Sequence, residues 1–414
     1  MSGPTGSTQR GREGTARALS SDLRGAGQLV TDAVGGVVDV VESMHRNISG
    51  LAPIVGPSRQ GPTRGITGLV YRSVRGISRV AGRGIDSALR QLGPLLEYRG
   101  VSDKRENMLA TLNGVLGDYL VATGNPLAIP MSFRKDGQAL NLDKESLEGA
   151  FPAPSPRVLV MVHGLCMNDL RWQRKGHDHG AELARSLGYT PLYLHYNSGL
   201  HISTNGREFA GLLEQLVRAW PVPVEELVIL GHSMGGLVAR SACHYGRIAG
   251  HSWPDRLNRL IFLGAPHHGS PLERVGNRVD ALAGVSPYVA PIGRLGKIRS
   301  AGVKDLRYGN LVDEDWAGLE PEHPHDARAI VALPADTECL AIAATMQSEP
   351  DDTGAFTRGD GLVPVTSALG LHDDAERVLP IPVHHQSVFS RLGHFDLLDS
   401  QEVYERIRSW LARD

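Results

Sequence analysis

Short apolar runs alternate with amphipathic stretches along the 414-residue chain, from about residue 105 onward. Helical spacing lies between several of these runs, most clearly where apolar positions recur from Phe209 to Val217. Strands that alternate with helices favour a parallel sheet covered by helices on both faces. The sequence therefore predicts an α/β fold with a doubly wound, mostly parallel sheet. The predicted strands are VLVMV (158–162), PLYLHY (191–196), LVIL (227–230), LIFL (260–263), CLAIA (339–343) and RVLPI (377–381).

The same pattern divides the chain into parts. Residues 1–26 are rich in Gly, Ser, Thr and Arg, which is typical of a disordered tail, and residues 27–104 are predicted to be a helical extension. The main domain spans residues 105–414 and begins with a helix and a β-hairpin, predicted at 107–122 and 127–143. Within it, residues 270–335 are rich in Gly and Pro and interrupt the alternation, so we expect an insertion that forms a mobile lid.

The extension carries an apolar stripe between Ile66 and Leu95, with arginines on its other faces. Over residues 57–105, ten basic residues stand against three acidic ones. A basic amphipathic helix of this kind suits peripheral contact with an anionic lipid surface. The alternative is a helix packed on the neighbouring domain. Several glycines favour that alternative, because they weaken a free-standing helix.

The composition mainly excludes classes of protein. Apolar residues make up 41% and charged residues 21% of the chain, and the formal net charge of −2 gives no global basicity for binding nucleic acid. Three cysteines lie far apart and show no CxxC spacing, which fits a reducing compartment. No run of 18 apolar residues and no secretory h-region is present. These features predict a cytoplasmic protein, with peripheral membrane contact as the option.

The motif GHSMG (231–235) fits the pattern G-x-S-x-G and lies between a predicted strand and a predicted helix. A strand-to-helix turn this tight forces its serine into a strained conformation, and glycines on either side let the backbones approach. This context favours Ser233 as a nucleophile, whereas the alternative is an ordinary serine in a Gly-rich turn.

A second motif, HGL (163–165), follows the first predicted parallel strand. The tetrahedral intermediate of an acyl transfer needs two backbone N–H donors aimed at its oxyanion. We expect these donors to be Met234, which follows the nucleophile, and Leu165. Three nearby residues are predicted to bind substrate, namely His163, Asn168 and Trp172. The alternative is that they only shape the turn.

Four motifs in the order VHGL, GHSMGG, LGAPHHGS and GDGLVP resemble the lipase and esterase branch of the α/β-hydrolase superfamily. The resemblance is strongest to bacterial relatives of the GPI inositol-deacylase (PGAP1-like) lipases, and it covers about residues 125–414. It implies an α/β-hydrolase fold, a Ser–Asp–His triad and hydrolysis of carboxylic esters. This reaction needs no cofactor, and the lack of an HExxH motif argues against a metal site.

In this fold the triad residues follow the order nucleophile, acid, histidine. Asp360 in GDGLVP matches the acid motif of the family, and His394 in LGHFDLL lies just before the last predicted helix. His394 would take the proton of Ser233, while Asp360 would hold the imidazole in the right tautomer. The rivals left open are Asp351, Asp352, Asp373, Asp374 and Asp396 for the acid, and His384 and His385 for the histidine.

The sequence thus predicts a serine-dependent esterase or lipase that acts on a small-molecule or lipid ester through an acyl-enzyme. One alternative is an acyltransferase or amidase that uses the same triad. Another is a lipid-surface binding protein whose triad is vestigial. His267 and His268 are expected to support the nucleophile region, and Cys166 to be a small buried thiol rather than a reactive one.

Overall fold

The computed structural model describes residues 103–270, 300–317, 328–349 and 359–413. The predicted tail at 1–26 and the extension at 27–102 lie outside the described residues, as do 271–299 and 318–327 within the predicted lid.

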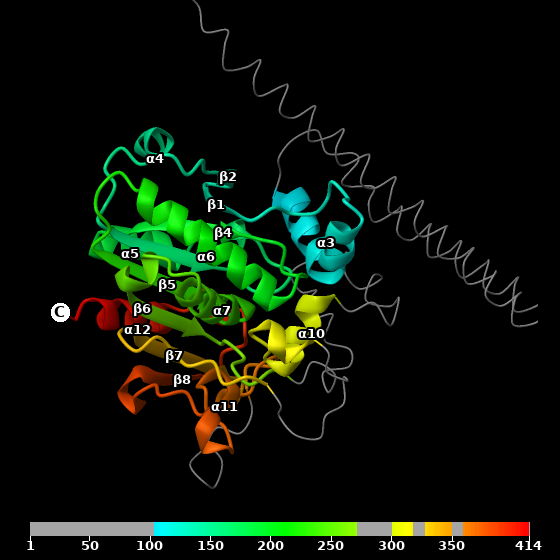
Figure 1. The fold of residues 1–414 in the computed structure, drawn as a ribbon. Helices are drawn as coiled ribbons and strands as arrows, with labels where there is room; N and C mark the ends of the chain where they lie inside the picture. Colours follow the sequence, from blue (N-terminus) through cyan, green and yellow to red (C-terminus); the bar gives the residue numbers. More distant parts are fainter. Residues whose placement is uncertain (1–102, 271–299, 318–327, 350–358, 414) are drawn as a thin grey trace, which may run out of the picture.

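One eight-stranded sheet runs through the described chain in the order β2-β1-β4-β3-β5-β6-β7-β8 (Figure 1). The hairpin of β1 and β2 pairs antiparallel with β4 at one edge, and every pairing from β4 to β8 is parallel. The predicted doubly wound, mostly parallel sheet is confirmed. The strands are β1 (Ser132–Lys135), β2 (Gln138–Ala139), β3 (Arg157–Val162), β4 (Thr190–His195), β5 (Glu226–His232), β6 (Leu257–Leu263), β7 (Glu338–Thr345) and β8 (Gln386–Ser390).

Helices cover both faces of this sheet. Alternate residues of β3 enter different cores, with Val160 facing α6 and α7 and Leu159 facing α5 and α12. Strands buried on both faces need apolar residues at every position, which explains why they appear in the sequence as unbroken apolar runs. The helices are α3 (Asp103–Ala122), α4 (Lys144–Ala150), α5 (His179–Leu187), α6 (Ile202–Ala219), α7 (Met234–Ile248), α10 (Ala301–Tyr308), α11 (Val365–Ala368) and α12 (Gln401–Leu411).

The last predicted strand, at 377–381, is wrong. Its apolar residues Leu379 and Ile381 are buried in the core, but Pro380 lacks the N–H that a strand would use for pairing. The true edge strand is β8. Its sequence, QSVFS, mixes polar and apolar residues and is only partly buried, since no described strand pairs with its outer edge. It therefore lacks the apolar run that marks the inner strands.

Two stretches of the predicted lid at 270–335 are among the described residues, 300–317 and 328–335, and both pack on the main domain. Its mobility stays a prediction. The helix α10 packs against α3 and α6 (Figure 1). The side chains of Leu306, Leu311 and Val331 are buried in the main core. Because burying these side chains removes their apolar surface from water, 300–317 and 328–335 form part of the folded body.

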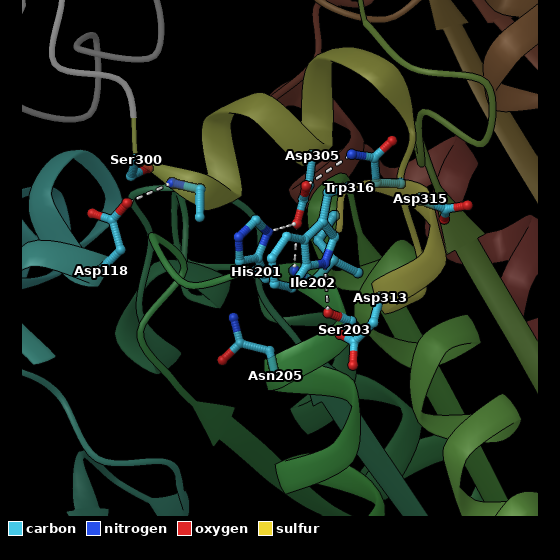
Figure 2. Close-up of polar contacts among 12 residues, drawn as sticks. Asp118, His201, Ile202, Ser203, Asn205, Ser300, Asp305, Asp313, Asp315 and Trp316 are labelled. Carbon is cyan, nitrogen blue, oxygen red and sulfur yellow. Dashed lines mark hydrogen bonds and ion pairs between the residues drawn. The ribbon is translucent and has the colours of Figure 1, made fainter. Parts of the chain in front are cut away.

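A buried carboxylate docks α10 onto the start of α6, as Figure 2 shows. Asp305 accepts hydrogen bonds from His201 Nδ1, from the backbone N–H of Ile202 and from Asn310 Nδ2, each at 2.9 Å. Trp316 stacks on the His201 ring at a centroid distance of 3.7 Å and donates its indole N–H to Ser203.

The other end of α10 is held by α3 (Figure 2). Asp118 accepts from the backbone N–H of Ala301 at 2.9 Å, which satisfies one of the free amides in the first turn of α10. Ser300 donates its hydroxyl to the carbonyl of Gly114 at 2.6 Å. The described part of the insertion is therefore fixed at both ends of its helix.

We expect Asp305→Ala to lower the free energy of unfolding by about 3 kcal/mol, because it leaves three donors without their acceptor in a buried setting. Urea unfolding of the whole protein measures the change. The matched control is Asp313→Ala in the same insertion. Asp313 forms a half-exposed ion pair with Arg207, so its loss costs about 1 kcal/mol or less. Equal effects of the two variants would show that Asp305 does not dock α10.

Candidate active site

Ser233 stands at the turn between β5 and α7, with φ 54° and ψ −124°. A positive φ is unfavourable for a residue with a Cβ and is held only where the surroundings impose it. Here the backbone N–H of Ser233 donates to the carbonyl of Leu263 at 2.9 Å. The strained turn that the motif predicts is present, and its serine is 6% exposed.

Glycines around this turn allow the end of β5, the start of α7 and the end of β3 to come into backbone contact. A Cβ on Gly235 would lie 2.2 Å from the carbonyl oxygen of Val162 in β3, and one on Gly231 would lie 2.6 Å from Gly236. Neither approach leaves room for a side chain. The turn is thereby pressed against the end of β3, where the HGL loop begins.

Asp360 and His394 form a buried pair beyond the ends of β7 and β8. Their Oδ2 and Nδ1 atoms are 2.6 Å apart, and the side chains are 1% and 3% exposed. The other carboxylate oxygen accepts from the backbone N–H groups of Leu362 and Val363 at 2.9 and 2.8 Å. Because a carboxylate can only accept, the His394 Nδ1 atom is the donor of this hydrogen bond.

The same structure brings this pair beside the serine turn. His232, the neighbour of Ser233, donates from Nε2 to the carbonyl of His394 at 3.2 Å, and the two rings are 4.7 Å apart. A Cβ on Gly264, which follows β6, would lie 3.2 Å from His394 Cε1 and 3.3 Å from Asp360 Oδ2. The three predicted triad residues therefore gather at the carboxyl edge of the parallel strands, where open α/β sheets bind ligands.

The backbone N–H groups of Leu165 and Met234 make no hydrogen bond to any of the described residues. Those of the next residues along the HGL loop are satisfied, since Cys166 donates to Ser198 and Met167 donates to Gly164. Met234 is the first residue of α7, where an amide has no acceptor within the helix. Two unused donors thus flank the serine turn, as an oxyanion site requires.

The three predicted substrate-binding residues are completely buried. His163 stacks on Tyr196 at 4.3 Å, and burial lowers its pKa to about 3, so the ring is neutral. Asn168 donates to Asn107 on α3, and Trp172 packs in the core beside α5 and α12. The structure gives each of them a packing role, and contact with substrate remains a prediction.

The rival histidines lie elsewhere. His384 and His385 belong to the short helix Val383–His385 at the amino end of β8, the opposite edge of the sheet from Asp360. His385 packs against Trp410.

Among the described residues, Asp360 is the carboxylate that hydrogen-bonds the imidazole of His394. Asp374 caps a short helix and Asp396 accepts from Gly393, whereas Asp351 and Asp352 lie outside the described part of the chain. No group of three or more His, Cys, Asp or Glu suited to hold a metal occurs in that described part.

Two features were not anticipated from the sequence. Gly264, at φ 58°, makes room for His394 and Asp360, and Arg240 is a charged residue 5% exposed inside α7. An arginine within the apolar helical run GLVARSAC was the available signal for the second. Cys166 is buried as expected, and burial raises the pKa of its thiol to about 12, which keeps it protonated.

Comparison with known proteins agrees with this fold. Residues 211–340 match the family described as PGAP1-like alpha/beta domain, a range that contains Ser233 and the LGAPHHGS motif. The expected resemblance is confirmed there and is consistent with an α/β-hydrolase of the lipase and esterase branch. A search of curated proteins finds no match.

Similar solved structures are lipases and esterases. The mature lipase BlEst2 of Bacillus licheniformis is 19% identical with a TM-score of 0.39, over 62% of this chain and 94% of that one. A thermophilic esterase of Thermogutta terrifontis is 16% identical with a TM-score of 0.34, over 68% and 92%. Aspergillus fumigatus lipase B is 11% identical with a TM-score of 0.41, over 68% and 56%. In the described part of the chain, no helix is long and apolar enough to cross a membrane.

We expect Gly235→Ala to destabilise the fold by about 3 kcal/mol, because its Cβ would meet the carbonyl oxygen of Val162 and displace the serine turn. The control is Gly211→Ala in α6, where a Cβ meets nothing within 4 Å and helix propensity predicts a gain of up to about 1 kcal/mol. Thermal unfolding compares the two. If both variants are as stable as the parent, the backbones are not in the tight contact described.

Proposed function

We propose that the protein is a serine-dependent carboxylic ester hydrolase that works through an acyl-enzyme. The observation that carries the proposal is the buried Asp360–His394 pair beside a serine held in a strained strand-to-helix turn. A structural role alone does not account for a serine held at positive φ together with an imidazole buried against a carboxylate.

In the proposed reaction, His394 Nε2 takes the proton of the Ser233 hydroxyl as its oxygen attacks the ester carbonyl. Asp360 keeps Nδ1 protonated and stabilises the imidazolium that forms. The N–H groups of Leu165 and Met234 donate to the oxyanion. The imidazolium then gives its proton to the departing alcohol, and water repeats the sequence on the acyl-serine, which releases the acid and restores the hydroxyl.

The two alternatives differ in what they require of this site. An acyltransferase or amidase uses the same residues, so adding alcohol or amine acceptors and measuring their capture of the acyl group distinguishes it from a hydrolase. A lipid-binding protein with a vestigial triad needs no contact between Asp360 and His394, and that contact favours an enzyme. Rates on p-nitrophenyl esters from C2 to C16 then define the acyl preference.

Variants of the proposed triad test the assignment. We expect Ser233→Ala to lower kcat/KM for a p-nitrophenyl ester by 10³-fold or more, on the order of the losses seen when a nucleophile is removed. Asp360→Asn should lower kcat by about 10⁴-fold with little change in KM, because the amide favours the wrong imidazole tautomer. Labelling by a fluorophosphonate should disappear in Ser233→Ala.

The matched control for the acid is Asp396→Asn, which lies two residues from His394 and should keep most of the activity. Circular dichroism establishes that each variant is folded. A folded Ser233→Ala protein with activity within tenfold of the parent would refute the nucleophile. A larger loss in Asp396→Asn than in Asp360→Asn would reassign the acid.

We also propose, from the sequence, that the basic stretch 57–105 brings the enzyme to an anionic lipid surface near its substrate. Each basic residue near such a surface contributes about 1 kcal/mol, and the attraction is screened by salt. We expect the protein to sediment with anionic liposomes at low salt and to be released as salt rises, with neutral liposomes as the control. If it stays in the supernatant at low salt, the extension has no such role.

A further inference from the structure

A cavity of about 140 Å³ lies beside α7. Its other walls include His267 and His268, the segment 328–332 and the segment 376–380. Arg240 lines it from α7, seven residues beyond Ser233. Seven residues of helix correspond to roughly 10 Å along the axis. The cavity is thus separate from the proposed catalytic residues.

Arg240 is the reason to expect a ligand here. It donates from Nη2 to the carbonyl of Val331 at 2.7 Å and from Nη1 to His267 Nδ1 at 3.3 Å. Its buried Nε has no hydrogen-bond partner, and no carboxylate forms an ion pair with it among the described residues. Burial, with the nearby charge of Arg328, lowers its pKa to about 10, so it remains a cation at neutral pH. The carboxylate of Asp315 opposes this fall in pKa but forms no close ion pair with Arg240. A buried charge without an ion-pair partner costs several kcal/mol.

Two other arginines of low exposure among the described residues have carboxylate partners. Arg259 pairs with Glu226 at 2.8 Å, and Arg134 pairs with Glu106 at 2.9 Å. Arg240 is more deeply buried than either and lacks such a partner. The difference points to an anion that comes from outside the described chain.

A second unused donor belongs to His267, which also lines this cavity. A guanidinium can only donate, so the Nδ1 atom of His267 must accept from Arg240. Burial holds the pKa of His267 well below its ordinary value, so the ring is neutral and its proton is on Nε2. That Nε2 is buried and has no hydrogen-bond partner. Arg240 and His267 together therefore present polar hydrogens that nothing in the described structure accepts.

Two further arginines line the cavity, and both also have partners of their own. Arg328 donates to the carbonyls of His267 and Gly309. Arg328 and Arg377 line the cavity with Arg240, whereas Glu376 is the carboxylate among its lining residues and is exposed. Arg377 also lies 3.6 Å from Asp374. Two further lining residues, Ile330 and Val378, are 58% and 38% exposed, so the cavity reaches the protein surface. At about 30 Å³ per water, its volume equals roughly four or five waters, a space comparable to that of the five heavy atoms of a phosphate group.

We propose that this cavity binds a phosphate group, either as free phosphate or as a phosphate ester. Guanidinium groups match the geometry of phosphate oxygens, and three of them suit a group that carries two negative charges. The site binds without reacting, and it is independent of the proposed ester hydrolysis.

Isothermal titration of the full-length protein with inorganic phosphate, at constant ionic strength, tests this proposal. We expect saturable binding and a rise in the unfolding midpoint with phosphate concentration. Arg240→Gln and Arg377→Gln should each weaken binding by tenfold or more. Arg377→Gln decides the matter if Arg240→Gln does not fold, because Arg377 lies nearer the surface. The control is Arg408→Gln, an exposed arginine paired with Glu405 on α12, which should bind phosphate like the parent.

A second titration with dihexanoyl phosphatidic acid below its micellar concentration separates the two sources. Tighter binding than inorganic phosphate, with the same loss in Arg377→Gln, identifies a phosphate ester, whereas weaker binding identifies free phosphate. Absence of saturable binding with both probes would overturn the proposal. Binding that is unchanged in folded Arg240→Gln and Arg377→Gln would overturn it as well.

Discussion

The contact between the serine turn and the end of β3 is the constraint on which the site depends. It requires backbone to lie on backbone at Gly235 and Val162, without space for a methyl group between them. This contact holds Ser233 at positive φ, brings the free amide of Met234 to the turn and places Gly164 against the serine. The parallel pairing of β3 and β5 supplies the frame, because neighbouring parallel strands end at the same edge.

Three buried carboxylates, those of Asp305, Asp315 and Asp360, are satisfied by N–H donors and not by a lysine or arginine. Asp360 receives two backbone amides and one imidazole, and Asp305 receives one amide and two side chains. Asp315 likewise accepts from three backbone amides, those of Leu311, Val312 and Ala329. Each is held without a full neutralising ion pair, since hydrogen bonds to a charged group contribute more than neutral ones. Arg240 is the contrasting case. It is a buried cation whose Nε has no hydrogen-bond partner among the described residues.

What the sequence could predict follows from how local each feature is. The inner strands and the serine turn are marked by contiguous residues, so apolar runs and G-x-S-x-G located them. The edge strand β8 is polar, and RVLPI resembled a strand because Leu379 and Ile381 are core residues outside the sheet. The docking of α10 depends on a contact between His201 and Asp305, 104 residues apart, for which no local pattern exists.

The same reasoning explains the buried residues near the HGL loop. His163 and Trp172 follow the strand end where ligands bind, so their position in the sequence favoured contact with substrate. Burial is decided instead by what packs on them, namely Tyr196 for His163 and the core beside α12 for Trp172. The oxyanion role of the Leu165 and Met234 amides stays a prediction. It could be made from the sequence because backbone donors depend on chain direction and not on side-chain packing. In this fold the course of the backbone places the amides of the proposed oxyanion site. The roles of the side chains around them are set by contacts between distant parts of the chain.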